Sequence, residues 1–215
     1  MKDENVIVVE NPLAKYYLTI LRDRNTSPKL FREYVRKLGF ILGYEASRYI
    51  KWKNTFVETP LARAEGIKPI KPVIVVGILG ASIPLIQGIW DAIPWAGLGL
   101  VAARRIESEY EVEIEVYYER LPDDLSPYTV LIADPMLATG KTIVNTIELL
   151  KKRNAKEIVV LTIIASKYGV EYVHGREKNV PIITITIDPF LNDRFFIVPG
   201  LGDAGDRGLG SDVSW

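Results

Sequence analysis

The chain has 215 residues, which is enough for one well-buried core with at most a small appended lobe. Its 27 Lys and Arg residues balance 27 Asp and Glu residues, so the whole-molecule charge offers no long-range attraction for nucleic acid or an anionic membrane. Because the sequence has no cysteine, disulfides, thiolate nucleophiles and cysteine-based zinc sites are excluded.

A short apolar strand and two helices come first in the chain. The strand is expected at Val6–Val9, and the absence of a charged segment followed by an apolar core at the start predicts a cytoplasmic protein. Residues 12–24 and 28–50 have helical spacing, with Ser27 before Pro28 as a helix start. The apolar face predicted for the second helix consists of Leu30, Tyr34, Val35, Leu38 and Leu42.

Residues 73–90 carry no charged side chain and therefore reach the length of a membrane span. The segment begins with a β-branched run, and Gly77, Gly80 and Pro84 interrupt the rest, where polar Ser82 and Gln87 also lie. This pattern predicts a buried strand, a turn and a packed helix rather than a span.

Three fully apolar runs, at 73–77, 129–133 and 158–164, are each followed by a turn and helix-compatible sequence. Strands that are buried on both faces read in this way, so we predict an α/β domain whose parallel sheet is covered by helices on both sides. Residues 97–102 and 182–187 are expected to add strands. Alternation at Val112, Ile114, Val116 and Tyr118 predicts an antiparallel arm, either a dimer contact or a solvated hairpin.

Residues 130–142 read VLIADPMLATGKT, an apolar strand that ends at Asp134 and a small-residue turn that leads into a helix near Gly140. In open α/β sheets, ligands collect at the carboxyl ends of strands. The turn 138–141 lets backbone amides converge on a phosphate, and the helix amino terminus adds partial positive charge. Asp134 would repel phosphate but can accept hydrogen bonds from ribose hydroxyls, so the pattern predicts a sugar-phosphate site.

This segment has two other interpretations. A nucleoside triphosphatase P-loop would need a glycine five residues before Gly140, where Pro135 stands. An ordinary strand-to-helix turn with a capping threonine stays open on this segment alone.

A second glycine-rich segment, residues 197–207, reads IVPGLGDAGDR. It could be a flexible tail, but the apolar run 195–198 that leads into it would draw it onto the body of the protein. Glycines allow a backbone to approach a ligand closely, and main-chain groups can match the donors and acceptors on a pyrimidine edge. The segment therefore predicts a base site.

Together, DPMLATGKT and IVPGLGDAGDR resemble the 5-phosphoribose loop and the uracil site of the uracil phosphoribosyltransferases, a branch of the type I phosphoribosyltransferase fold. The opening helices and VETPL are also similar to this family. The resemblance implies a central, mainly parallel sheet flanked by helices in a single domain, 1–215, with a core at about 70–187. It further implies a hood over the base site from about 1–60 and 188–215, and a protruding β-arm at about 106–127.

The resemblance also implies roles for particular residues. Phosphoribosyl pyrophosphate would be bound by Arg105, Asp134, Pro135, Met136, Leu137, Ala138, Thr139, Gly140, Lys141, Thr142 and Asp203. Uracil would be bound by Ile197, Gly202, Asp203 and Ala204. Asp134, Asp203 and Arg105 would be the catalytic residues, and Mg²⁺ would be held through the substrate diphosphate rather than by a protein metal site.

One position departs from the family pattern. The turn 77–82 reads GILGAS, with Gly80 where the family has a diphosphate-binding arginine. Losing such a charge-assisted contact costs about 1.5 to 3 kcal/mol, which Mg²⁺ could partly offset. Arg105 keeps the family spacing, with Arg104 beside it, although a solvated surface pair is the alternative interpretation of these two arginines.

The expected reaction is transfer of 5-phosphoribose from phosphoribosyl pyrophosphate to uracil, giving UMP and pyrophosphate in pyrimidine salvage. Two alternatives are a catalytically weak or inactive ligand-binding homologue, because of Gly80, and a transferase for another base. The resemblance also implies a homodimer or homotetramer and GTP as a candidate effector. His174, Trp90 and Trp95 are interpreted as structural residues.

Overall fold

The computed structural model describes residues 5–107 and 112–210, and only the backbone of 104–107 and 112–114. Its centre is an eight-stranded sheet in the order β1-β10-β9-β7-β4-β5-β6, with β8 paired to β9 off this path. The strands are β1 (Val6–Val8), β4 (Val73–Leu79), β5 (Gly97–Glu107), β6 (Val112–Arg120), β7 (Thr129–Ala133), β8 (Met136–Leu137), β9 (Glu157–Ser166) and β10 (Ile182–Asp188). All pairings are parallel except β5 with β6, which confirms the predicted mainly parallel sheet.

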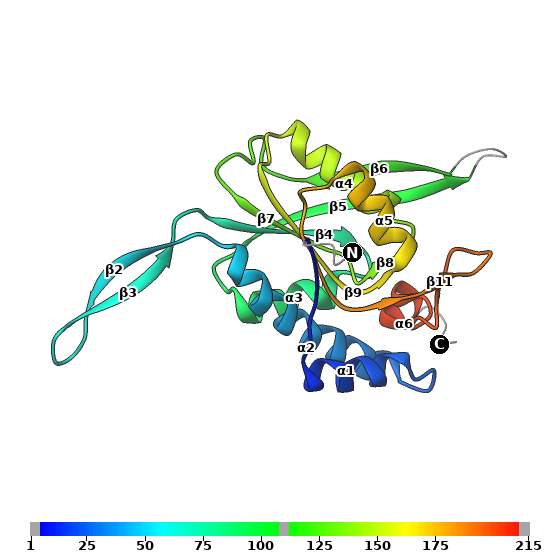
Figure 1. The fold of residues 1–215 in the computed structure, drawn as a ribbon, viewed down its shortest axis with the longest axis horizontal. Helices are drawn as coiled ribbons and strands as arrows, with labels where there is room; N and C mark the ends of the chain where they lie inside the picture. Colours follow the sequence, from blue (N-terminus) through cyan, green and yellow to red (C-terminus); the bar gives the residue numbers. More distant parts are fainter. Residues whose placement is uncertain (1–4, 108–111, 211–215) are drawn as a thin grey trace.

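Helices cover both faces of the sheet (Figure 1). They are α1 (Pro12–Arg22), α2 (Pro28–Ala46), a 3₁₀ helix (Ser47–Tyr49), α3 (Ile83–Ala92), α4 (Lys141–Lys152), α5 (Lys167–Arg176) and α6 (Ala204–Leu209). Successive residues of a strand point to opposite faces, so Val75 packs in the core under α1 to α3, whereas Val76 packs in the core under α4 and α5. This two-sided burial is the reason that the strands are continuously apolar.

The two N-terminal helices are shorter than the sequence predicted. The first ends at Arg22 because Asp23 is already extended, and the second ends at Ala46 before the 3₁₀ turn. The apolar face predicted for the second helix is wrong at Leu30, which is 43% exposed. Phe31 occupies the buried position instead, because it shares the 3.6-residue period with Val35.

The uncharged segment 73–90 forms β4 and most of α3, as expected from its glycines and proline. Within the described residues, no helix combines the length and the apolarity needed to cross a bilayer.

Two antiparallel hairpins extend from the body (Figure 1). The predicted antiparallel strand is present as β6, which pairs with β5 at the edge of the main sheet, and residues 108–111 lie outside the described part. The second hairpin, β2 (Trp52–Glu58) with β3 (Arg63–Pro69), was not predicted. It projects to the left in Figure 1, away from the sheet and its helices.

Candidate active site

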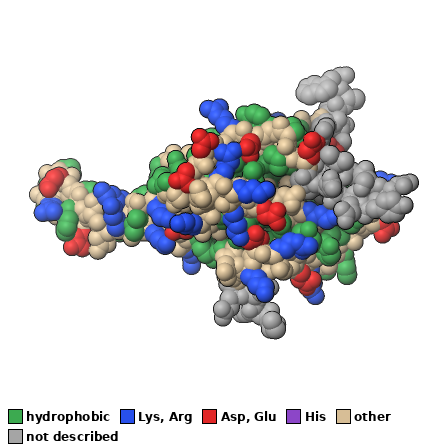
Figure 2. Space-filling view, turned by 90° about the horizontal axis from the view of Figure 1, so that it is seen from above, with side chains coloured by type: hydrophobic (Ala, Val, Ile, Leu, Met, Phe, Trp, Pro, Cys, Tyr) green, Lys and Arg blue, Asp and Glu red, His purple; other side chains and the backbone are tan. Residues whose placement is uncertain are grey.

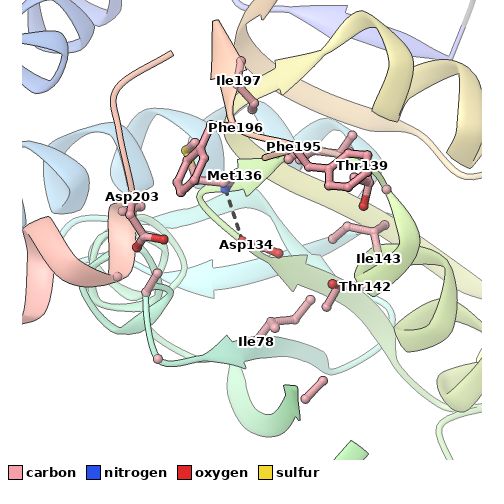
Figure 3. Close-up of a pocket in the computed structure, with 18 of the residues that line it drawn as sticks. Ile78, Asp134, Met136, Thr139, Thr142, Ile143, Phe195, Phe196, Ile197 and Asp203 are labelled. Atoms are coloured by element: carbon pink, nitrogen blue, oxygen red, sulfur yellow. Dashed lines mark hydrogen bonds between the residues drawn. The ribbon is translucent and has the colours of Figure 1, made fainter. Parts of the chain in front are cut away.

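The turns after β4 and β7 open onto a cavity of about 450 Å³, and the stretch from β12 (Ile197–Val198) to α6 closes it. Figure 3 shows Asp134, Thr142 and Asp203 around this shared space. The volume is typical of small-molecule pockets. The two glycine-rich segments identified in the sequence, 66 positions apart in the chain at Thr139 and Gly205, therefore belong to one cavity.

Most of the predicted site residues line the cavity. They are Asp134, Met136, Leu137, Ala138, Thr139, Gly140, Thr142, Ile197, Gly202, Asp203 and Ala204. Pro135 and Lys141 lie in the same turn but are not part of the described lining. The backbone of Arg105 pairs with Ile114 in the β5–β6 hairpin, and its side chain lies outside the described residues.

The turn after β7 has the geometry of an anion site. Asp134 follows the last residue of the strand, and its Oδ1 accepts a hydrogen bond from the Met136 N–H at 3.2 Å. Gly140 has φ +78° and is the N-cap residue of α4, and the Thr139 hydroxyl accepts the Lys141 N–H at 3.5 Å. The amino terminus of α4 lines the cavity through Gly140 and Thr142, and the helix dipole there favours negative charge.

The Ser166 side chain holds this turn in place. The Ser166 hydroxyl donates to the Ala138 carbonyl at 2.5 Å and accepts from the Gly169 N–H at 2.8 Å, which ties the turn to the amino terminus of α5. The backbone of Gly140 lies so close to α5 that a side chain would not fit, because a Cβ on Gly140 would be 2.8 Å from the Gly169 carbonyl oxygen. Both the positive φ and the lack of space require glycine at 140.

The C-terminal segment bends into the cavity through two glycines with positive φ. Gly200 has φ +60°, and a Cβ there would lie 2.0 Å from the Ile197 carbonyl oxygen, while Gly202 has φ +80°. Asp203 then starts α6, and its Oδ1 accepts the Asp206 N–H at 2.9 Å. The cavity-lining backbone at 202–205 is therefore a turn held in one conformation rather than a loose tail.

Arginines fasten α6 to the N-terminal helices. Arg207 donates to the Leu21, Asp23 and Leu201 carbonyl oxygens, and burial lowers its pKa. Arg32 donates to the Gly208 carbonyl oxygen at 2.8 Å. These bonds satisfy carbonyl groups at the end of α1 and hold the C-terminal segment over the cavity.

Several lining residues were not predicted as site residues. They are Ile78, Leu79, Gly80, Ala81, Ala103, Ile143, Arg194, Phe195, Phe196 and Gly205. Arg194 to Phe196 lie in the turn between β11 (Phe190–Leu191) and β12, where Asn192 Oδ1 accepts the N–H groups of Arg194 and Phe196. Arg194 is the one cationic side chain in the described lining. The apolar run 195–198 was a signal for this turn, but periodicity could not show that it faces a ligand.

Gly80 lies in the cavity wall, in the turn after β4, as the resemblance implied. A Cβ there would meet Leu209 Cδ1 at 3.5 Å, an ordinary van der Waals distance, so this position has space for a side chain. His174, Trp90 and Trp95 are outside the described lining, and the Trp90 indole N–H donates to the Ala96 carbonyl oxygen at 3.0 Å.

The parallel sheet, its antiparallel edge strand and the cavity-lining turn after β7 define a type I phosphoribosyltransferase fold. A solved adenine phosphoribosyl transferase from Trypanosoma brucei shares this fold, with a TM-score of 0.52 at 18% identity, over 89% of this chain and 87% of that one. The chain belongs to the uracil phosphoribosyltransferase family, whose model matches residues 8–210.

Two relatives are similar along nearly the whole chain. A uracil phosphoribosyltransferase from Aeropyrum pernix is 48% identical over 95% of this chain and 96% of its own length. A solved protein from Aquifex aeolicus is 31% identical with a TM-score of 0.87, covering 94% of this chain and 97% of that one. The family prediction made from the two motifs is therefore confirmed.

Proposed function

We propose that this chain transfers the 5-phosphoribosyl group of phosphoribosyl pyrophosphate to N1 of uracil, which releases pyrophosphate and gives UMP. The observation that carries the proposal is the single cavity lined by both the phosphate turn and the glycine-rich C-terminal turn. A donor and an acceptor bound at these two turns would meet between them. Family membership supports this reaction over an inactive ligand-binding homologue.

The turn after β7 is proposed to hold the donor. The amino terminus of α4 and the backbone of 138–142 would bind the 5-phosphate, since this turn lines the cavity and the helix end carries partial positive charge. Asp134 would accept hydrogen bonds from the ribose hydroxyls. The pairing of β8 with β9 would fix the position of the turn through Pro135, Met136 and Leu137.

The C-terminal turn is proposed to hold the base. Gly202 and Ala204 expose main chain to the cavity, and Ile197, which is 4% exposed, would pack on the pyrimidine. Main-chain groups can match the alternating edge of uracil without contributing a competing charge. Asp203 would face the donor as well as the base, because it lines the same cavity as Asp134.

In the proposed reaction, the bond from the anomeric carbon to the diphosphate oxygen breaks and the bond to uracil N1 forms. The N1 proton is lost, and the bonding electrons leave with pyrophosphate. Positive charge develops on the ribose ring, so the protein contributes mainly by holding the reactants in line and placing charge correctly. Asp134 and Asp203 are the carboxylates of the described lining, where negative charge would stabilise this ring.

Positive charge near the diphosphate is proposed to come from arginines and Mg²⁺. Arg194 lines the cavity. Arg105 follows Ala103 by two residues on β5, and Ala103 also lines the cavity. No cluster of three or more metal-binding side chains occurs among the described residues, whereas Mg²⁺ is commonly bound by one or two carboxylates, water and substrate oxygens. The two cavity carboxylates fit this mode, with the ion held largely by the substrate and screening its charge.

We also propose that residues of about 1–60 and 188–215 form the hood over the base.

We further propose that the chain assembles as a homodimer or homotetramer. The β2–β3 hairpin projects from the body (Figure 2) and has exposed apolar side chains, with Phe56 at 53%, Leu61 at 96% and Ile67 at 62%. Such surface favours contact with another chain. Light scattering after size exclusion tests this, and a monomer would contradict it. GTP as an effector and a cytoplasmic location stay predictions from the resemblance and the sequence.

The reaction is tested by incubating the purified protein with uracil, phosphoribosyl pyrophosphate and Mg²⁺ and separating the nucleotides chromatographically. UMP and pyrophosphate should form in equal amounts. Asp134→Asn should reduce turnover strongly, whereas Asp124→Asn, in the loop before β7, should leave it unchanged. Hypoxanthine or xanthine offered in competition should not be converted, and absence of UMP from the wild type would reject the proposal.

A further inference from the structure

An aspartate and an arginine meet beneath the C-terminal turn. Asp188 ends β10 and is 3% exposed, and Arg22 is the last residue of α1. Arg22 Nη2 donates to Asp188 Oδ1 at 2.7 Å, and Nη1 donates to Oδ2 at 2.8 Å. This fork joins two elements that are 166 residues apart in the sequence.

The pair also holds both polar groups of one glycine. The Gly200 N–H donates to Asp188 Oδ2 at 2.7 Å, and Arg22 Nη1 donates to the Gly200 carbonyl oxygen at 2.7 Å. We call these three residues the Gly200 clasp. Gly200 is buried and has φ +60°, so the clasp fixes a residue whose backbone could otherwise adopt many conformations.

The chemistry of the clasp requires an ionised carboxylate. Burial raises the pKa of Asp188. The hydrogen bonds from Arg22 and the Gly200 N–H lower the pKa by a larger amount, so the net pKa is below its ordinary value. A buried carboxylate with these partners forms strong, charge-assisted bonds of fixed direction. The segment after Gly200 is rich in glycine, so these bonds to its backbone add to the burial of Leu201 and Ala204 in placing it.

We propose that Arg22 and Asp188 are positioning residues for the acceptor base: through Gly200 they set the location of Gly202 to Ala204 in the cavity. Neither side chain is in the described lining, so they would act through the main chain rather than by touching uracil. This inference rests on the proposed function, because it assigns the C-terminal turn to the base. It predicts selective damage to the acceptor end of the cavity, while the phosphate turn, held by Ser166 from a different element, is unaffected.

The test uses Asp188→Asn, which keeps the shape of the side chain but removes its charge, and Arg22→Lys, which keeps the charge but loses the fork. Both variants should raise the KM for uracil at least tenfold and change the KM for phosphoribosyl pyrophosphate by less than twofold. Asp91→Asn is the matched control, because Asp91 accepts a similar fork from Arg36 at 2.6 and 2.9 Å, between α2 and α3. It should change neither constant.

Hydrogen exchange gives a readout that does not need turnover. In Asp188→Asn, the amides of 200–206 should exchange at least tenfold faster than in the wild type, with 138–144 unchanged. Unchanged exchange at 200–206 would overturn the proposal, and so would faster exchange without a selective rise in the KM for uracil. If the wild type makes no UMP, the proposed function fails, and the exchange measurement alone then decides whether the clasp holds this turn.

Discussion

Replacing Ser166 by alanine is expected to weaken both the fold and the donor end of the cavity. Ser166 is fully buried, and its hydroxyl makes two bonds, to the Ala138 carbonyl and from the Gly169 N–H. Loss of a serine N-cap costs about 0.5–2 kcal/mol. The partly buried Ala138 carbonyl also loses its donor, which costs about 1 kcal/mol or more. The free energy of unfolding should therefore fall by about 3 kcal/mol.

The functional part of this prediction concerns the phosphate turn. Without the hydroxyl, the turn is no longer tied to α5, so the KM for phosphoribosyl pyrophosphate should rise about tenfold, which corresponds to about 1.4 kcal/mol. The KM for uracil should stay within twofold of the wild-type value. Steady-state kinetics with each substrate varied in turn measure both constants, and thermal unfolding should show a drop of roughly 6–12 °C in Tm.

Asn11→Ala is the matched control, because Asn11 also caps a helix, accepting the Leu13 N–H at 2.8 Å at the start of α1. It should cost about 1 kcal/mol and leave both KM values unchanged. The reasoning would be refuted if Ser166→Ala lost no more stability than Asn11→Ala and bound the donor normally. A rise in the KM for uracil, with no rise in the KM for phosphoribosyl pyrophosphate, would also contradict the assignment of this turn to the donor.

Three further changes have distinct expected outcomes. Gly140→Ala places a Cβ at φ +78°, at a cost of about 1–3 kcal/mol, and should raise the KM for phosphoribosyl pyrophosphate, whereas Gly175→Ala, with open space around it, should not. Gly80→Arg adds a guanidinium to the cavity wall and should lower the same constant about tenfold or more, while the neutral Gly80→Gln should give no gain. Glu157 has its pKa lowered to about 2, chiefly by the hydrogen bond from Lys51. Its stabilisation is therefore present above about pH 4.5 and lost as the pH falls towards 2, so urea unfolding from pH 7 to 2 should show a smaller acid loss in Glu157→Gln than in the wild type.

The sequence by itself determined the fold class and the two glycine-containing turns that line the cavity. Continuous apolar runs such as 129–133 can be satisfied only by strands buried on both faces, and a turn of small residues after such a strand lies at the ligand-binding edge. The glycines at 140 and 200 indicated close backbone approach, and the structure adds that both have positive φ and leave no room for a Cβ.

The tertiary structure alone decided what touches these turns. The β2–β3 hairpin has too little alternation to be recognised, since much of it is exposed on both faces. Leu30 and Phe31 are neighbouring apolar residues, and the contact of the Arg207 guanidinium with the Phe31 ring, which the sequence does not show, covers Phe31 in the folded chain. The Gly200 clasp joins α1, β10 and the C-terminal turn, and the pairing of charges so far apart in sequence depends on the folded arrangement of those elements. Local patterns record the conformation of each segment, whereas contacts between distant segments arise only when the chain has folded.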